Sequence, residues 1–300
     1  VPRIALVGAG RMGTLHAERI AALGAGKVCL VVDRDPARAE LLAGRYGAVA
    51  RATLGELGNV DGVIIASPPK SHPSIAERCL EQGLAVLVEK PLAPTLVDAR
   101  RLWETALRSG GILRVGHSER FCPAYRSARP LLVSATHFVC ERLVARRAPN
   151  ATLDPLFDLM IHDLDILFDV TSSRVGRVVS ADVDEANGAC TVRATVQYRN
   201  GRTADLTAGY VAVGARRRLV AHAGPSAIEL DWVKRSVAAL EPRGPRLVFS
   251  ADSPSADVIG REQAEFFDAL VRGSPSVDGV EAAVAAVEHA EMIRAQLSRA

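Results

Sequence analysis

Residues 4–13 read IALVGAGRMG, an apolar run that passes directly into a glycine-rich turn. The first four residues have the composition of a buried strand, and the turn has the G-x-G-x-x-G spacing. Gly8 permits a tight turn, Gly10 lets the backbone approach a pyrophosphate, and Gly13 lets the next helix pack against the strand. That helix, expected over residues 12–23, directs its N-terminal amides at the phosphates. The pattern predicts a dinucleotide-binding unit.

Asp33 ends a second apolar run, Val28–Val32, about 20 residues after the turn, as this motif requires. A carboxylate here accepts hydrogen bonds from an adenosine ribose and repels a 2′-phosphate, which favours NAD over NADP. Arg34 keeps NADP open as the alternative, because a neighbouring arginine accommodates that phosphate. We expect NAD, held in this part of the chain by Gly8, Gly10, Arg11, Met12, Gly13, Asp33 and Arg34.

The composition is that of an ordinary globular chain of 300 residues, with 48% hydrophobic residues and a formal net charge of +3. The densest basic run, Arg216–Arg218, fits a solvated strand end better than a nucleic-acid-binding tail. No apolar stretch reaches the ~18 residues of a membrane span, and no signal-peptide pattern is present. We expect a cytoplasmic protein with no nucleic-acid or membrane partner. Five scattered cysteines without a CxxC pair indicate neither a disulfide framework nor a metal site.

The first 117 residues alternate apolar strands with amphipathic helices, which predicts a parallel sheet covered on both faces. The expected strands are 4–7, 28–32, 60–66, 84–88 and 112–116. The expected helices are 12–23, 71–82 and 95–108, with another that begins at Asp35-Pro36. This is the α/β pattern of a doubly wound Rossmann domain, which we assign to residues 1–117.

The pattern changes after about residue 134, where longer strands alternate apolar and polar positions. Strands are expected at 189–198 and 203–213, joined by the hairpin signal Asn200-Gly201, and then at 218–223 and 227–233. Helices are expected at 155–170, 257–272 and 280–298, and loops at 242–245 and 253–255. We therefore expect a second α+β domain, residues 118–300, with a large open, mostly antiparallel sheet.

Ligands of a parallel sheet lie beyond the carboxyl ends of its strands. The strand at 60–66 is followed by Ser67-Pro68-Pro69 and then His72. These prolines stiffen a turn that would pass under the nicotinamide, although a plain helix start capped by Ser71 fits equally well.

The next strand ends in Glu89-Lys90-Pro91. Lys90 would lie beside the nicotinamide and hydrogen-bond a substrate oxygen. The alternative is an exposed ion pair at a strand end, which contributes little. We assign the nicotinamide end of the cofactor site to Ser67, Pro68, His72, Glu89 and Lys90.

The helix expected at 155–170 carries Asp158 and His162, which are four residues apart and share one face. Asp165 and Asp169 continue this stripe. A carboxylate one turn from an imidazole suits a general acid/base, because it fixes the tautomer and raises the basicity of the ring. A surface ion pair and a metal-binding pair are the alternatives, but no further metal ligand is evident nearby.

His117, Arg120 and Tyr125 lie where the two expected domains meet, which is the usual place for a substrate. We therefore predict these residues as substrate ligands, together with Lys90, Asp158 and His162. We interpret the last three as the catalytic residues, because they accompany a nicotinamide-binding fold.

Taken in order, these motifs resemble the glucose-fructose oxidoreductase/inositol dehydrogenase/MocA (Gfo/Idh/MocA) family over essentially the whole chain. The matching elements are GAGRMG with His16, SPP with His72, Glu89-Lys90-Pro91, GHSERF with Cys122-Pro123, and Asp158-x-x-x-His162-Asp163-x-Asp165. The resemblance implies a Rossmann domain, a C-terminal sheet used for homodimer or homotetramer contacts, and Lys90, Asp158 and His162 as the active-site trio. The GHSERF segment is most similar to the branch that acts on nucleotide sugars, such as UDP-N-acetylglucosamine 3-dehydrogenases.

We therefore predict an NAD(P)-dependent oxidoreductase that transfers a hydride between a nicotinamide and a hydroxyl or ketone group of a sugar or nucleotide sugar. His162 would take the hydroxyl proton with the help of Asp158, while Lys90 positions the substrate oxygen. One alternative keeps the enzyme and changes the substrate to an inositol, an aldose or a small cyclic imine. Another is a non-catalytic dinucleotide sensor, which would need none of these three residues.

Overall fold

A computed structural model describes residues 1–145, 154–185, 190–212, 214–251 and 257–298. The chain divides into two compact units, Val1–Ser118 with Asp257–Val284, and Glu119–Ala256 with Ala285–Ala300. We predicted a second domain that runs without interruption from 118 to 300, but residues 257–284 group with the first unit. The reason is packing: Phe266 and Phe267 are buried in the core of that unit.

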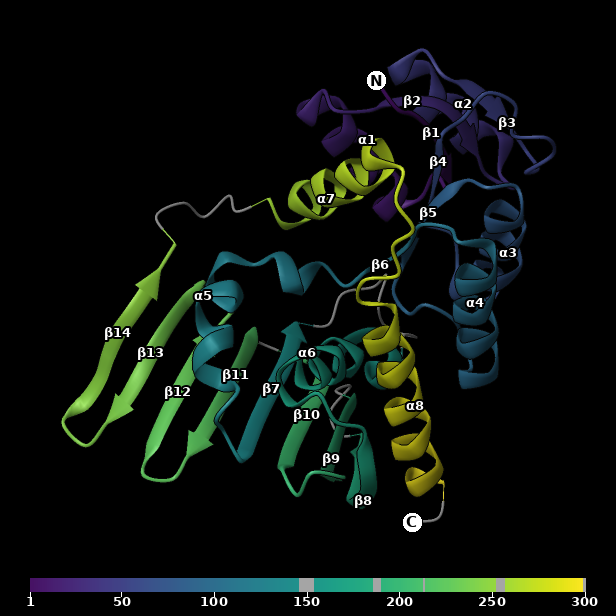
Figure 1. Cartoon of the computed structure of the whole chain (residues 1–300). Coiled ribbons are helices and arrows are strands. Elements are labelled where there is room, and N and C mark those ends of the chain that lie inside the picture. Colours follow the sequence, from purple (N-terminus) through teal and green to yellow (C-terminus); the bar gives the residue numbers. More distant parts are fainter. Residues whose placement is uncertain (146–153, 186–189, 213, 252–256, 299–300) are drawn as a thin grey trace. The chain divides into compact units, whose positions relative to one another are not determined.

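The first unit is built on a six-stranded parallel sheet with the strand order β3-β2-β1-β4-β5-β6 (Figure 1). The strands are β1 Arg3–Val7, β2 Lys27–Val32, β3 Val49–Arg51, β4 Gly62–Ile65, β5 Ala85–Glu89 and β6 Leu113–Gly116. The order reverses between β1 and β4, and ligands of doubly wound sheets bind at such a point. The predicted Rossmann fold is confirmed, although the short and poorly buried β3 gave no apolar signal.

The helices of this unit are α1 Arg11–Leu23, α2 Pro36–Tyr46, the 3₁₀ turn η1 Pro69–Ser71, α3 His72–Glu81, α4 Leu96–Ser109 and α7 Val258–Arg272. The carboxylate of Asp35 accepts hydrogen bonds from the first amides of α2, as the Asp-Pro signal predicts. Figure 1 shows α7 beside α1, where its two phenylalanines join a core formed with β1 and β2.

The second unit contains an eight-stranded sheet with the order β14-β13-β12-β11-β7-β10-β9-β8. The strands are β7 His137–Ala145, β8 Val175–Asp184, β9 Cys190–Tyr198, β10 Thr203–Val211, β11 Arg216–Ala223, β12 Ser226–Asp231, β13 Ser236–Glu241 and β14 Gly244–Ser250. Among the described strands of this sheet, only β7 and β10 pair in parallel, so the predicted mostly antiparallel sheet is confirmed. The loop expected at 242–245 is instead a hairpin turn with its last two residues in β14, and the loop expected at 253–255 lies outside the described residues.

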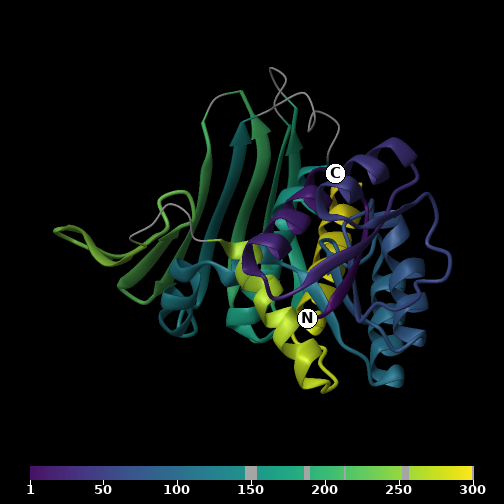
Figure 2. The ribbon, with the colours of Figure 1, turned by 90° about the horizontal axis from the view of Figure 1, so that it is seen from above.

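One face of this sheet carries helices. They include α5 Pro123–Leu132, which packs on β12, β13 and β14, and the segment η4 Leu156–Met160, which packs on β10 (Figure 2). The segment η4 is a π-helix that continues into α6 Ile161–Thr171, so the helix predicted at 155–170 is present with an unexpected first turn. The helix α8 Val280–Leu297 begins in the first unit and ends in the second. We did not predict α5, because Pro130 inside it is a helix-breaking signal.

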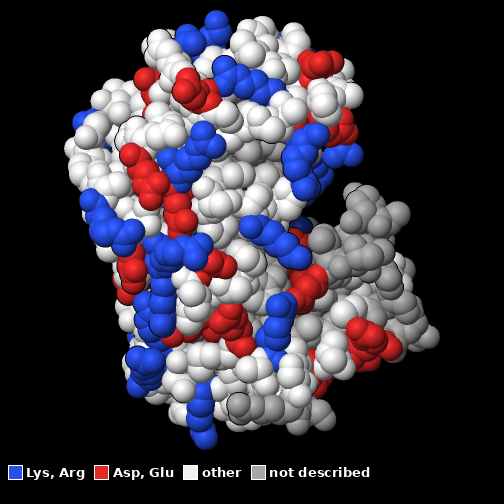
Figure 3. Space-filling model, turned by 90° about the vertical axis from the view of Figure 1, so that its right-hand side faces the viewer, with Lys and Arg blue, Asp and Glu red and all other residues white. Residues whose placement is uncertain are grey.

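Charges of both signs are interspersed on the face of the molecule that Figure 3 shows. Among the described residues, no helix combines the length and apolar character needed to cross a bilayer.

His289 on α8 is completely buried, and its Nε2 accepts a hydrogen bond of 2.9 Å from the amide of Val175. Burial, followed by the charges of Arg174 and Arg199, lowers the pKa of His289 to about 3. The unfolded chain titrates at about pH 6.5, so between these values acid favours the unfolded state, which alone binds the proton. At about 1.4 kcal/mol per pH unit, the loss of stability reaches about 3–5 kcal/mol at about pH 3.

We expect His289→Gln to flatten the fall in the free energy of unfolding between about pH 6.5 and pH 4. Urea denaturation at several pH values measures this slope, and the slope is informative even where the variant is less stable throughout. Parallel slopes in the parent and the variant would show that another group causes the acid sensitivity.

Candidate active site

A cavity of about 910 Å³ lies in the first unit at the carboxyl ends of β1, β2 and β4. This volume lies within the range of cofactor pockets, about 300–1,000 Å³. The predicted cofactor residues that line it are Gly8, Gly10, Arg11, Met12, Asp33, Arg34, Ser67 and Pro68. Arg38, Lys70 and Ser71 also line the cavity, and the sequence did not single them out for this role.

The three glycines of the turn differ in what a side chain at each position would meet. Gly8 has a φ of +102°, and a Cβ there would lie 2.6 Å from the carbonyl oxygen of Ala66. A Cβ on Gly13 would lie 1.8 Å from the carbonyl oxygen of Gly8, so Gly13 packs behind the cavity and does not line it. Apart from its two chain neighbours, no described residue places an atom within 4 Å of a Cβ built on Gly10, which leaves room for a phosphate beside its backbone.

The carboxylate of Asp33 is fixed at the wall of this cavity by two backbone amides. Its Oδ2 accepts from the amide of Ala9 at 2.7 Å, and its Oδ1 accepts from the amide of Asp35 at 2.9 Å. Each oxygen keeps a further lone pair for a ribose hydroxyl. Arg34 and Arg38 line the same cavity, and Arg38 pairs with Asp35 at 3.1 Å.

We expect Asp33→Ala to weaken the binding of NADH by roughly 10–100-fold, the scale of hydrogen bonds to a charged group. The binding of NADPH should change much less, because removing the carboxylate also removes its repulsion of the 2′-phosphate. Fluorescence titrations with both reduced dinucleotides measure the two effects. A larger loss for NADPH than for NADH would reverse the assignment of Asp33.

Glu89 does not line the cavity, contrary to its predicted contact with the cofactor. Its Oε1 lies 2.8 Å from Nε2 of the buried His16, whose Nδ1 lies 2.8 Å from the side-chain amide nitrogen of Gln263. Because the amide donates, Nδ1 accepts, and the neutral ring therefore carries its hydrogen on Nε2 and donates to Glu89. Glu89 thus joins the end of β5 to α1 and α7, while Lys90 is the next residue along the chain.

His72 is also behind the cavity wall and is fully buried. Its Nε2 lies 2.8 Å from the carbonyl oxygen of Ser67, and its Nδ1 lies 2.9 Å from that of Pro91. His72 therefore contacts the two loops that follow β4 and β5 and does not reach the cavity itself. Lys90 is half-buried at the same carboxyl edge of the sheet and is not among the residues that line the cavity.

In the second unit, Asp158 lies in the π-helical turn η4 and His162 in the first turn of α6. Asp158 accepts a hydrogen bond from the hydroxyl of Tyr210 on β10. Burial, with the contact to Asp158, raises the pKa of Tyr210, so its hydroxyl stays protonated and remains a donor. Single π-helical turns occur frequently at functional sites.

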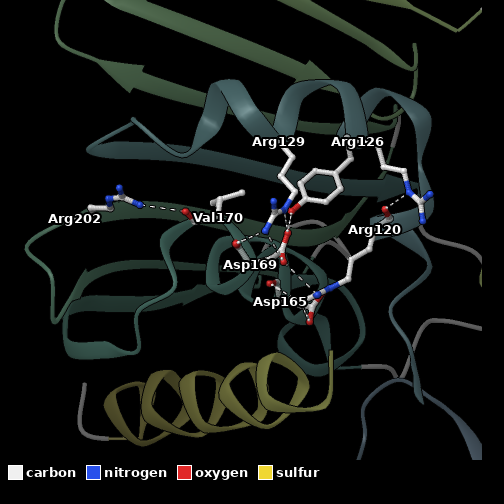
Figure 4. Close-up of polar contacts among 8 residues, drawn as sticks. Arg120, Arg126, Arg129, Asp165, Asp169, Val170 and Arg202 are labelled. Atoms are coloured by element: carbon white, nitrogen blue, oxygen red, sulfur yellow. Dashed lines mark hydrogen bonds and ion pairs between the residues drawn. The ribbon is translucent and has the colours of Figure 1, made fainter. Parts of the chain in front are cut away.

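The helix α6 is held by arginines of two neighbouring segments. Figure 4 shows Arg120 and Arg129 directed at carboxylates of α6. Arg120 donates to both oxygens of Asp165, at 2.6 and 2.9 Å, while Asp169 accepts from Arg129 at 2.7 Å and from the hydroxyl of Tyr125. Bidentate arginine–carboxylate pairs are geometrically specific, so they fix the rotation of the helix.

A second bidentate pair lies deeper in this unit. Arg142 on β7 donates to both oxygens of Asp163, at 3.0 and 2.8 Å, and to Glu119 at 2.8 Å. Arg142 and Asp163 are both buried, and the ring of Trp232 covers the guanidinium at 5.4 Å. Asp163 directly follows His162 in the chain, so this pair anchors the turn that carries His162. Asp163 was visible in the sequence motif, but Arg142 gave no local signal.

These contacts change the interpretation of the predicted substrate ligands. Arg120 and Tyr125 are occupied by α6, and Tyr125 is 2% exposed. His117 is also buried, and its amide donates to Val115. The structure thus uses Arg120 and Tyr125 to hold a helix, whereas we had predicted direct substrate contact. Among the described residues, no group of three or more His, Cys, Asp or Glu is arranged to hold a metal ion.

Comparison with known proteins places this chain in a family. Residues 2–117 match the Gfo/Idh/MocA family model, described as an oxidoreductase family with an NAD-binding Rossmann fold. A UDP-N-acetylglucosamine 3-dehydrogenase of Acidithiobacillus ferrooxidans is 30% identical over 223 residues, which covers 72% of this chain and 70% of that protein. The chain belongs to the Gfo/Idh/MocA oxidoreductase family.

Other members of the Gfo/Idh/MocA family extend the comparison. A myo-inositol dehydrogenase of Streptomyces leeuwenhoekii is 33% identical over 191 residues, or 59% of this chain and 58% of that protein. The solved structure of the Acidithiobacillus ferrooxidans enzyme superposes with a TM-score of 0.89 over 99% of this chain and 98% of that chain, at 24% identity, which establishes the shared fold. As a family member, the chain is an oxidoreductase of CH–OH groups that uses NAD, as the sequence predicted.

Proposed function

We propose that this protein oxidises a hydroxyl group of a sugar-type substrate, and that a nucleotide sugar of the UDP-N-acetylglucosamine kind is the first candidate. The observation that carries this proposal is the cavity over Gly10, with the fixed carboxylate of Asp33 in its wall. Lys90 follows β5 at the same carboxyl edge of the sheet, where a substrate oxygen would need a cation. The residues that line the cavity fit a dinucleotide by shape and chemistry.

In the proposed mechanism, the ammonium of Lys90 donates a hydrogen bond to the substrate oxygen and stabilises it as the carbonyl forms. His162 accepts the hydroxyl proton, and Asp158 supports the resulting positive charge on the imidazole. When bound, the nicotinamide supplies a hydride acceptor for the carbinol carbon. Proton and hydride together account for the two hydrogens that an alcohol loses. The ion pairs of α6 keep His162 in one orientation during this transfer.

The nucleotide-sugar candidate is supported by the relative that aligns over the larger share of this chain, 72% against 59% for the inositol dehydrogenase. An inositol or an aldose remains the second candidate, because the myo-inositol dehydrogenase is slightly more identical where it does align. We also propose that residues 1–117 bind the cofactor, that the second domain binds the substrate, and that the open sheet supports a homodimer or homotetramer.

A substrate panel tests this proposal. The purified protein is incubated with NAD and, separately, with UDP-sugars, inositols and free aldoses, and reduced nicotinamide is followed by absorbance. Reduction with a UDP-sugar is the expected result. Reduction with an inositol or aldose alone would keep the enzyme and replace the substrate. Tight NAD binding without reduction by any compound would instead support the dinucleotide sensor.

A further inference from the structure

Both ring nitrogens of His72 face hydrogen-bond acceptors. The carbonyl oxygen of Pro91 lies 2.9 Å from Nδ1, and that of Ser67 lies 2.8 Å from Nε2. A carbonyl oxygen only accepts, so each contact is a hydrogen bond only if the facing nitrogen carries a hydrogen. A neutral imidazole has one N–H and therefore satisfies one of the two carbonyls. Only the imidazolium form satisfies both.

The two carbonyls belong to different functional loops. Ser67 and Pro68 line the dinucleotide cavity after β4, whereas Pro91 follows Lys90 after β5. In the neutral ring, one tautomer holds the Ser67 loop and the other holds the Pro91 loop. The released carbonyl then faces a nitrogen lone pair of a ring that is itself fully buried, which is unfavourable.

We propose that His72 is a positioning residue whose imidazolium form ties the Ser67 loop to the Lys90 loop and thereby tightens the binding of NAD. His72 acts through the backbone of both loops and touches neither cofactor nor substrate. The proposal uses only the binding of NAD by the first unit. It therefore does not depend on the identity of the substrate or on the roles of Asp158 and His162.

The surroundings of the ring act on its pKa in both directions. Burial lowers the pKa of His72, while the two carbonyls and the charge of Glu89 raise it. The charged residues on elements packed against α3 are Glu89 on β5, Lys70 on η1, and Asp98, Arg100, Arg101, Glu104 and Arg108 on α4. On α3 itself, Glu77 is paired with Arg101 at 2.6 Å. Since the net shift is downward, protonation belongs below the ordinary value of about pH 6.5.

The direction in which NAD affinity changes with pH follows from the linkage between proton binding and NAD binding. If the imidazolium form binds NAD more tightly, affinity rises as pH falls through the titration of His72. We expect about tenfold tighter binding at the acid end of the His72 titration than at about pH 8, the factor that one charge-assisted hydrogen bond supplies. In His72→Asn, which cannot gain a proton, affinity should change less than about twofold over this range. Calorimetric titration with NAD measures both proteins.

The protonation state is read directly by nitrogen-15 NMR of histidine-labelled parent protein. At about pH 8 only one ring nitrogen of His72 should have the signature of an N–H group, and at the acid end of the His72 titration both should. His289 is the internal reference, because its pKa is lowered to about 3 and its Nε2 accepts a hydrogen bond from the amide of Val175. His72→Asn, or His72→Gln where the first variant fails to fold, assigns the signals.

Two results would overturn the proposal. One is a His72 ring in the parent that keeps one bare nitrogen at every pH at which the protein stays folded. The other is an NAD affinity whose pH dependence is absent in the parent or unchanged in the variant. If no compound of the substrate panel reduces NAD, the NMR of His72 and the titration with NAD still give their results. A failure of the proposed function is therefore distinguishable from a failure of this inference.

Discussion

Replacing His162 by asparagine is expected to lower turnover by roughly 10²–10⁴-fold, the usual contribution of a general acid/base. Asparagine keeps a polar side chain but accepts no proton in this pH range. The affinity for NAD should stay at the parental value, because the residues that line the cavity all belong to the first unit. Turnover is measured with the substrate that the panel identifies, and affinity by calorimetric titration.

His137→Asn is the matched control for this substitution. His137 lies on β7 in the same unit, contacts Thr203 at 2.9 Å, and has no proposed role in catalysis. We expect this variant to turn over at nearly the parental rate. Equal turnover by His162→Asn and the parent would remove His162 from the mechanism. Equal losses in both variants would instead indicate a general disturbance of the second unit.

Replacing Arg142 by methionine is expected to cost about 3–5 kcal/mol of stability, the scale for breaking one side of a buried ion pair. The substitution leaves the buried carboxylate of Asp163 without its bidentate partner. It also removes the closer of two arginines, Arg142 and Arg217, that pair with Glu119. Trp232 lies over this guanidinium, so its fluorescence reports unfolding locally. A Trp103→Phe background removes the other tryptophan, which lies on α4 in the first unit.

Arg193→Met serves as the control for charge removal alone. Arg193 pairs with Asp182 and Asp184 at 3.2 and 3.5 Å, with about half of each side chain exposed. Pairs of this kind contribute about 0–1 kcal/mol. Adding Asp163→Leu to Arg142→Met should recover part of the lost stability, because it removes the uncompensated carboxylate. If Arg142→Met and Arg193→Met unfold at the same denaturant concentration, the buried pair does not anchor α6 as described.

The sequence predicted the first unit well, because its signals are local. The apolar strands, the glycine turn and the Asp-Pro helix start each depend on a few neighbouring residues. The same dependence on local signals explains which features were not predicted. The strand β14 is almost entirely exposed and shows no alternation, and α5 contains an internal proline. The grouping of α7 with the first unit depends on two phenylalanines that pack against strands more than 200 positions earlier in the chain.

The candidate site shows the same limit. Some residues that line the cavity, such as Gly10 and Asp33, were predictable from their spacing along the glycine-turn motif. Residues occupied by distant partners were not: Arg120 lies 45 positions from Asp165, and Glu89 lies 73 positions from His16. Sequence spacing identifies a residue that can perform chemistry, but only tertiary contacts tell whether that residue is already occupied.

The most direct test of the account follows a labelled hydrogen from the substrate. A panel compound that reduces NAD is prepared with deuterium on the carbinol carbon, and the nicotinamide product is examined by mass spectrometry. We expect the deuterium on the nicotinamide ring with the parent protein, and a rate of transfer lower by roughly 10²–10⁴-fold with His162→Asn under conditions where NAD is bound. Reduced nicotinamide without deuterium, or equal transfer by both proteins, would contradict the proposed oxidation of a hydroxyl group by these residues.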